Sequence, residues 1–272
     1  MKISAMSDCF RLGFEGGLRK AAEMGLDGVQ FHLSSVQPQA DQPLEEARAR
    51  AIRALIQDCG IVISATCSEL GGFNCDEAEL KTRLARTGDF VRMTAQLGAK
   101  ITTAHIGQVP EDKADPVYAR MRDAMGQVAQ FCAQHGVKYA VETGPEKAQV
   151  LKGLLDDIAS PYLGVNLDPA NLVMCSDDDP VAATLLLKDY ILHCHAKDGI
   201  NLTRPVHKPW PDAPADWRYI EVPLGQGEVD FPAWIQALKQ AGFEGYMAIE
   251  REVGESPEAD IQMALDFLRA EL

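Results

Sequence analysis

In four stretches of this sequence, an apolar run ends at a side chain that can bind a metal or carry a proton. Ile191–Gly199 reads Ile-Leu-His-Cys-His-Ala-Lys-Asp-Gly and contains His195. The other three runs end on Glu142, Asp168 and Glu250 and lie in Tyr139–Gly144, Leu163–Asn171 and Tyr246–Glu252. Two glutamates, one aspartate and one imidazole form a mixed oxygen and nitrogen donor set that suits a divalent cation. The sequence therefore predicts a metal site if the fold brings these four side chains together.

The apolar runs alternate with helical patterns along the whole chain. Four earlier strand candidates precede those named above: Lys2–Met6, Gly28–Leu33, Ile61–Cys67 and Lys100–Ile106. Continuous runs rich in Val and Ile indicate parallel strands that are buried on both faces. Eight strands, each followed by a helix, predict a single (β/α)8 TIM barrel spanning residues 1–272, in which the C-terminal strand ends converge on one mouth. A doubly wound sheet is the main alternative, but Ser7-Asp8-Cys9 is not its glycine-rich first turn.

Helical periodicity and capping residues mark the segments between the strands. Apolar stripes predict eight helices, at Glu15–Glu23, Leu44–Cys59, Glu79–Leu97, Tyr118–His135, Val150–Ile158, Val181–Leu187, Phe231–Ala241 and Ile261–Leu272. Asp76 with Glu79 resembles a capping box. Asp179 and Ser256 each precede a proline, which predicts a capping side chain followed by a first-turn proline.

One long segment, residues 199–230, interrupts this alternation after the seventh strand. It contains Trp210, Trp217 and several prolines. A connection of this length inside a compact domain is usually functional, so we expect a lid with one of the tryptophans near a substrate. A packed surface excursion is the alternative. The Gly225-Gln226-Gly227 motif within it follows no strand and indicates no nucleotide site.

Side-chain alternation predicts what lies beneath the four candidate ligands. If His195 points into the barrel, His193 points inward one layer below it, because side chains alternate along a strand. The same parity places three further residues in that layer, namely Ala140, Asn166 and Ala248. Small and hydrogen-bonding side chains there would leave room for the ligands and orient them, and His193 fits this supporting role better than a ligand role.

Composition restricts the class of partner. The chain has 26 basic and 40 acidic residues, giving a net charge of −14, which disfavours a nucleic-acid partner. Its seven cysteines form no C-x-x-C pair, so we expect reduced thiols in a cytoplasmic protein. The sequence has neither an N-terminal apolar signal nor an apolar window of about 18 residues, so we expect no membrane association. The sequence leaves homo-oligomerisation open.

The motifs around the four candidate ligands resemble those of a known superfamily. Val-Glu-Thr at Glu142, Asn-Leu-Asp-Pro-Ala-Asn at Asp168, His-Ala-Lys-Asp at His195 and Ala-Ile-Glu at Glu250 are similar to the sugar isomerases and epimerases of the xylose-isomerase-like TIM barrels. The stretch from Val222 to Phe231, followed by Gly-Phe-Glu-Gly-Tyr, resembles the C-terminal signature of that family. The superfamily also includes the abasic-site endonuclease family 2, dehydratases of keto-inositols and enzymes of oxidised glycosides.

The resemblance implies a metal-dependent enzyme of carbohydrate metabolism. One divalent ion, with Mn²⁺ expected first and Mg²⁺, Co²⁺ or Zn²⁺ as alternatives, would be held by Glu142, Asp168, His195 and Glu250. Glu142 and Glu250 would also form the acid–base pair that isomerises or epimerises a sugar or keto-sugar through a metal-bound enediolate. The small-molecule carbohydrate would be the partner of this site.

Four further residues are candidate substrate contacts. His105 lies at the end of the fourth strand and is expected to face the same mouth. His32 lies at the end of the second strand and either faces the mouth too or has a structural role. Asn171 stands where many relatives have histidine; it can hydrogen-bond a hydroxyl but cannot carry a proton at neutral pH. Lys197 and Arg204 are candidates to neutralise developing charge, with an ordinary surface role as the alternative.

Two other reactions compete with isomerisation or epimerisation. A metal-dependent lyase or dehydratase acting on a keto-sugar or keto-inositol begins with the same proton abstraction. An abasic-DNA endonuclease needs about three metal ions and more histidine ligands. The chain has only six histidines and a net charge of −14, so this alternative is the less favoured one.

Overall fold

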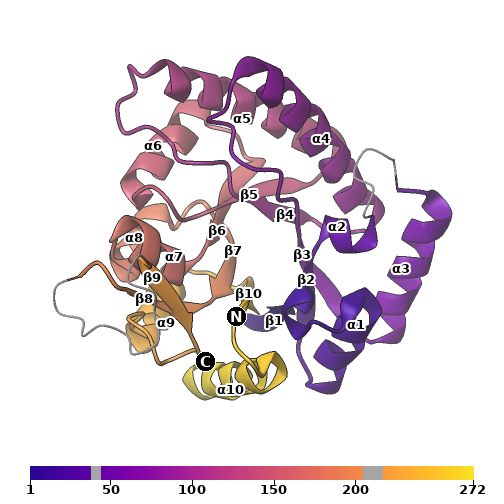
Figure 1. The fold of residues 1–272 in the computed structure, drawn as a ribbon. Helices are drawn as coiled ribbons and strands as arrows, with labels where there is room; N and C mark the ends of the chain where they lie inside the picture. Colours follow the sequence, from indigo (N-terminus) through magenta and orange to yellow (C-terminus); the bar gives the residue numbers. More distant parts are fainter. Residues whose placement is uncertain (38–43, 205–216) are drawn as a thin grey trace.

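The computed structural model describes residues 1–37, 44–204 and 217–272. Eight parallel strands close into a barrel in the order β1, β10, β7, β6, β5, β4, β3, β2, and Figure 1 shows the helices arranged around them. The strands are β1 (Lys2–Met6), β2 (Gly28–His32), β3 (Val62–Cys67), β4 (Ile101–Ala104), β5 (Lys138–Glu142), β6 (Leu163–Leu167), β7 (Ile191–Ala196) and β10 (Tyr246–Ile249). The predicted TIM barrel is confirmed.

The helices that follow the strands lie close to the predicted positions. They are α1 (Gly13–Glu23), α3 (Glu46–Asp58), α4 (Glu77–Gln96), α5 (Pro116–His135), α6 (Ala148–Ile158), α8 (Pro180–Leu187), α9 (Phe231–Gln240) and α10 (Pro257–Glu271). The sequence did not predict four short elements, namely a 3-10 turn at Ser7–Phe10, α2 (Leu33–Val36), α7 (Pro169–Asn171) and a π-helical turn at Leu172–Ser176. Within the described part of the chain, no helix combines the length and apolar character needed to cross a membrane.

Two of the three predicted helix caps are present. The Asp76 side chain accepts a hydrogen bond from the Glu79 N–H, and the Asp179 side chain accepts one from the Val181 N–H. The prediction for Ser256 is wrong, because its side chain makes no capping hydrogen bond. Its backbone has φ −129° and ψ 68°, outside the extended conformation in which a capping side chain normally reaches the first turn.

The interior of the barrel differs from the layer between strands and helices. Large apolar side chains such as Phe10, Phe231 and Trp234 are fully buried in the core. The strand residues that face the interior of the barrel include six buried polar ones: Ser4, Gln30, Ser64, Thr103, Asn166 and His193. Barrels of this type are usually filled by Val, Ile and Leu. The polar filling indicates that the interior supports a site at the mouth.

Two register shifts adjust the strands beneath the mouth. Between β2 and β3 the pairing passes from Val29 with Ile63 to Gln30 with Ala65, so Ser64 is the extra residue. Between β6 and β7 it passes from Val165 with Ile191 to Asn166 with His193. Such irregularities re-aim side chains and are frequent beside functional sites.

Part of the segment 199–230 forms a small sheet beyond β7. Strands β8 (Asp198–Asn201) and β9 (Tyr219–Val222) pair in antiparallel fashion. The buried Asp198 carboxylate accepts hydrogen bonds from four backbone N–H groups, those of Gly199, Gly225, Gly227 and Val229. This acceptor explains the Gly-Gln-Gly motif, because a Cβ on Gly227 would lie 2.1 Å from Asp198 Oδ1. Trp210 lies outside the described residues.

Gly164 in β6 packs closely against neighbouring backbone, so its substitution tests the packing of the barrel. A Cβ on Gly164 would lie 2.4 Å from the Tyr190 carbonyl oxygen and 2.5 Å from Leu192 Cγ. We expect Gly164→Ala to lower the free energy of unfolding by about 1–3 kcal/mol, because the clash includes backbone atoms. Urea denaturation followed by circular dichroism measures this change.

The matched control is Gly126→Ala in α5, where an added Cβ meets no atom within 4 Å. This substitution should raise the free energy of unfolding by about 0.5–1 kcal/mol, because alanine favours the helix. Equal effects of the two substitutions would contradict the packing described for β6.

Candidate active site

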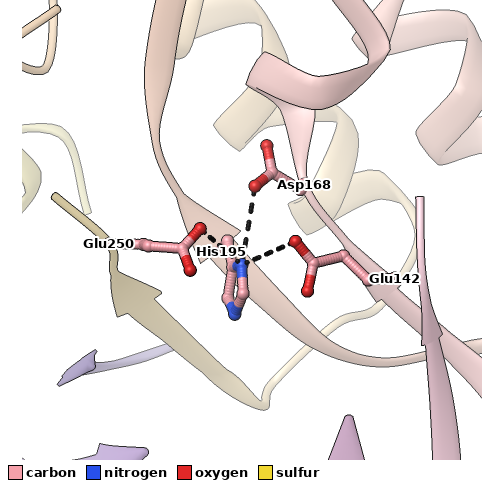
Figure 2. A group of neighbouring side chains, drawn as sticks. All are labelled: Glu142, Asp168, His195 and Glu250. Atoms are coloured by element: carbon pink, nitrogen blue, oxygen red, sulfur yellow. Dashed lines mark ion pairs between the residues drawn. The ribbon is translucent and has the colours of Figure 1, made fainter. Parts of the chain in front are cut away.

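Four strand ends place the predicted ligands around one point. Glu142 is the last residue of β5, Asp168 follows β6, His195 lies in β7 and Glu250 follows β10. One ligand atom from each residue lies within 4.8 Å of the ligand atoms of the other three. Figure 2 shows the three carboxylates around the imidazole. All four residues are buried, so the fold brings together the set that the sequence predicted.

The imidazole stands at the centre of the carboxylates. His195 Nδ1 lies 3.1 Å from Glu250 Oε2, 3.4 Å from Glu142 Oε1 and 3.5 Å from Asp168 Oδ2. Burial acts to lower the pKa of His195, but Glu250 and Glu142 raise it well above its ordinary value. A positive charge at this point is therefore strongly favoured, whether a proton or a metal ion provides it.

Two buried atoms in the cluster have no hydrogen-bond partner among the described residues. Asp168 uses Oδ1 to accept from the Asn171 N–H at 2.9 Å, as the cap of α7, which leaves Oδ2 free. His195 Nδ1 is the second such atom. Both face the same point, and a divalent cation would satisfy them together with the two glutamates. The residues therefore fit a divalent metal ion.

The acidic groups are held in their ionised form. Burial acts to raise the pKa of Glu142, but His195 and His105 lower it overall. The pKa of Glu250 also falls well below its ordinary value, because His195 and Lys197 outweigh the effect of burial. Both carboxylates can therefore accept a proton or bind a cation near neutral pH.

The layer beneath the cluster contains the predicted supporting residues. Asn166 Nδ2 lies 3.3 Å from Glu142 Oε2 and 3.1 Å from His195 Nε2. Asn166 Oδ1 contacts His193 Nδ1 at 2.9 Å, and His193 Nε2 contacts Ser64 Oγ at 3.3 Å. Burial lowers the pKa of His193 well below its ordinary value, so the ring is neutral. His193 and Asn166 thus lie where side-chain parity placed them.

A cavity of about 1090 Å³ opens above the cluster. His105, Asn171 and Lys197 line it together with Glu142 and Glu250. Asn171 Nδ2 donates to Glu142 Oε1 at 3.1 Å, and His105 Nε2 lies 3.5 Å from the same oxygen. These predicted contacts are therefore at the mouth of the barrel.

The other candidates at the mouth have different surroundings. His32 lines the cavity, and its hydrogen bond with Asp8 raises the pKa of His32 to about 11. Trp217 also lines the cavity, as expected for part of the segment 199–230. Arg204 is not among the lining residues; its guanidinium pairs with Asp177 and Glu228 instead.

A buried charge network joins β9 to the cluster. Lys197 Nζ lies 3.0 Å from Glu250 Oε2, 2.6 Å from Glu252 Oε2 and 3.8 Å from Glu221 Oε2. Arg251 binds the other oxygen of Glu221 at 2.7 Å. Glu221 and Arg251 were not predicted from the sequence. The alternation of polar and apolar residues in Tyr-Ile-Glu-Val was the available signal for a strand there.

Comparison with known proteins places this site in a family. A family model described as a xylose isomerase-like TIM barrel matches residues 18–271. The chain belongs to this family. The match spans all four members of the cluster, so the xylose isomerase-like barrel is the framework on which the site is built.

Solved structures share the fold over nearly the full chain. A xylose isomerase domain protein from Planctomyces limnophilus has a TM-score of 0.80 and 25% identity, covering 99% of this chain and 95% of the other. The probable 3-DHS dehydratase AsbF from Bacillus anthracis has a TM-score of 0.77 and 20% identity, with 99% of each chain covered. A D-allulose 3-epimerase from Methylomonas sp. has a TM-score of 0.75 and 16% identity, covering 100% and 98%.

Curated relatives match over shorter segments. The uncharacterized protein YfiH of Bacillus subtilis (strain 168) is 31% identical over 127 residues, which is 42% of this chain and 39% of that protein. The uncharacterized protein MJ1311 of Methanocaldococcus jannaschii is 22% identical over 205 residues, 71% of this chain and 64% of that protein. This xylose isomerase-like chain therefore matches less than two thirds of the length of either relative.

A second cavity, of about 450 Å³, adjoins the first on the same face of the barrel. Pro145 and Cys175 line both cavities, and the buried Glu146 lines only the second. Glu146 Oε2 accepts from the Val109 N–H at 3.2 Å, but burial raises the pKa of Glu146 to about 7. Glu146 was not predicted from the sequence, because an acid four positions after a strand has no distinctive signal.

The raised pKa of Glu146 predicts a pH-dependent stability. In the unfolded chain this glutamic acid ionises near pH 4.5, whereas in the folded protein it stays protonated up to about pH 7. The stability that Glu146 contributes is therefore complete below pH 4.5 and is lost as the pH rises through about 7. Between pH 5 and 8 the wild-type protein should lose on the order of 3 kcal/mol relative to Glu146→Gln.

Urea unfolding of both proteins at several pH values measures this difference. Glu77→Gln, at an exposed position in the first turn of α4, is the control and should follow the wild-type pH profile. If the profile of Glu146→Gln runs parallel to the wild-type profile, the carboxyl group does not titrate as described.

Proposed function

We propose that this protein is a divalent-metal-dependent isomerase or epimerase that acts on a sugar or keto-sugar. The observation that supports this proposal is the buried set of Glu142, Asp168, His195 and Glu250, whose two glutamates line the large cavity. These four residues would hold one divalent ion, and their oxygen-rich donor set fits Mn²⁺, Mg²⁺ or Co²⁺, with Zn²⁺ as an alternative. The bound ion would supply Lewis acidity to a substrate carbonyl.

The two glutamates would exchange the proton. Glu142 and Glu250 come from β5 and β10 and face His195 from two sides, so a substrate carbon above the cluster lies between two carboxylates. One carboxylate removes the proton next to the carbonyl, and the other returns a proton to the opposite face of the carbon. Proton return to the opposite face inverts the stereocentre, which is an epimerisation.

Neighbouring side chains tune this exchange. The Asn171 amide and the Asn166 amide donate to the two oxygens of Glu142 and hold its carboxylate in place. Lys197 holds Glu250 from the other side and carries a positive charge near the reacting carbon. His105, at the rim beside Glu142, is available to bind a substrate hydroxyl. The role predicted for Arg204 is not part of this proposal, because its guanidinium pairs with Asp177 and Glu228.

A dehydratase is the second candidate function. Among the structures reported above, the dehydratase AsbF has a higher TM-score than the epimerase, 0.77 against 0.75. Removal of the same proton followed by loss of a hydroxyl group from the next carbon would give an unsaturated ketone and water. Protonated Lys197 beside Glu250 is placed to donate a proton to the departing hydroxyl.

Turnover in D₂O tests the reaction type. We expect an epimerase with two bases to incorporate deuterium at the carbon next to the carbonyl, because its proton exchanges with solvent. A panel of keto-sugars followed by NMR and mass spectrometry measures this incorporation. A product lighter by one water would identify the dehydratase instead, and a rearranged product without deuterium would favour direct hydride transfer.

Replacement of each glutamate tests the acid–base assignment. Glu142→Gln and Glu250→Gln preserve the volume and remove the basic oxygen, so turnover should fall by at least about 100-fold. Metal content must be measured beside the rate, because each glutamate is also a proposed ligand. Glu244→Gln, at an exposed position preceding β10, is the control and should keep the wild-type rate. Full turnover by metal-loaded Glu142→Gln would refute the assignment.

A further inference from the structure

Gln30 is a fully buried amide in the middle of β2, below the mouth of the barrel. Its Oε1 lies 3.0 Å from His195 Nε2, the ring nitrogen that faces away from the carboxylates. The two residues are 165 positions apart in sequence. An uncharged amide buried at this depth must satisfy its donors and its acceptor locally, so the identity of each partner is informative.

The hydrogen bonds around Gln30 fix which end of the amide faces His195. Gln30 Nε2 donates to Thr103 Oγ1 at 2.8 Å, and the Thr103 hydroxyl donates to the Thr66 carbonyl at 3.4 Å. With the amide in the opposite orientation, the Thr103 hydroxyl would have to donate to the Gln30 carbonyl oxygen. It could then no longer donate to the Thr66 carbonyl oxygen. The chain of donors therefore runs toward Thr66 and leaves Gln30 Oε1 as an acceptor for a ring N–H.

A second amide approaches the same ring nitrogen. Asn166 Nδ2 lies 3.1 Å from His195 Nε2, but it also donates to Glu142 Oε2 at 3.3 Å. Nε2 thus lies between an amide donor and an amide acceptor. When the hydrogen is on Nε2, Gln30 accepts it, Asn166 keeps Glu142 as its acceptor, and the lone pair of Nδ1 is available to a cation between the three carboxylates.

We propose that Gln30 is a positioning residue that keeps the ring hydrogen of His195 on Nε2, so that Nδ1 is free to bind the divalent cation. The inference rests on the metal site proposed above. Metal-binding histidines usually donate their other N–H to a carboxylate, a carbonyl or water, which fixes the ring and its hydrogen. Here a glutamine held by Thr103 takes that place, on a strand that supplies no ligand itself.

The protonation of His195 can be read directly in the wild-type protein. Protein labelled with ¹⁵N at histidine and loaded with diamagnetic Zn²⁺ should show, in a long-range ¹H–¹⁵N spectrum, a hydrogen on His195 Nε2 and a metal-bound Nδ1. The signals are assigned by their absence in His195→Gln. A hydrogen on Nδ1 in the loaded protein would overturn the proposal without requiring any variant of Gln30.

Variants of Gln30 test its contribution to affinity. Gln30→Met keeps the length of the side chain and removes the acceptor, so the Mn²⁺ dissociation constant measured by calorimetry should rise about 10- to 100-fold. Gln30→Glu restores an acceptor and should bind within a few-fold of wild type. A purely structural role would instead lower the melting temperature of both metal-free variants and leave the affinity of the folded fraction unchanged.

The control removes a different buried hydrogen bond, one that joins β3 to α4 on the outer side of the barrel. Thr66→Val deletes the contact between Thr66 Oγ1 and Thr94 Oγ1, 2.8 Å long, and leaves the Thr66 carbonyl in place. It should keep the wild-type Mn²⁺ affinity. Equal affinity of Gln30→Met and wild type would overturn the role of Gln30 while the metal site stands. No Mn²⁺ binding by wild type would overturn the metal site and this inference together.

Discussion

The mutual repulsion of three buried carboxylates is the constraint on which the rest of the site depends. Glu142, Asp168 and Glu250 are all buried and lie within a few ångströms of His195 Nδ1. Charges this close repel strongly in a medium of low dielectric constant. A positive charge must offset them, and Lys197 supplies part of it from the side of Glu250. The unpartnered oxygen of Asp168 marks where the remainder is needed.

The polar interior of the barrel follows from this constraint. Carboxylates that repel one another stay in place only if neutral groups behind them hold their orientation. Asn166 and Gln30 do so through contacts with Glu142 and His195, and His193 in turn contacts Asn166. A polar layer contributes little apolar packing. That packing lies outside the strands, where Phe231 and Trp234 of α9 are fully buried.

The geometry of a parallel barrel explains which parts of the site could be predicted from the sequence. The convergence of Glu142, Asp168, His195 and Glu250 was predictable because a parallel barrel brings its C-terminal strand ends to one mouth. Side-chain parity extended this prediction to His193 and Asn166. Gln30 was missed because its partner lies on a distant strand, although a glutamine inside the apolar run Gly-Val-Gln-Phe-His was a usable signal. The pairing of β8 with β9 depends on Asp198 accepting N–H groups from residues about 30 positions later, which no local pattern reveals.

In the proposed enzyme, the residues assigned to the chemistry and the wall of the cavity lie on different parts of the structure. The cluster and its supporting amides lie on barrel strands, whose positions are fixed by pairing on both sides. The wall of the cavity above the cluster includes Trp217 and β9. Strand β9 pairs with β8 and is not part of the barrel. Among the contacts of the described residues given above, only the charge network through Lys197 and Glu221 connects β9 to the cluster. Changes in β9 that preserve Glu221 can therefore alter which molecule fits, while the distances within the cluster stay the same.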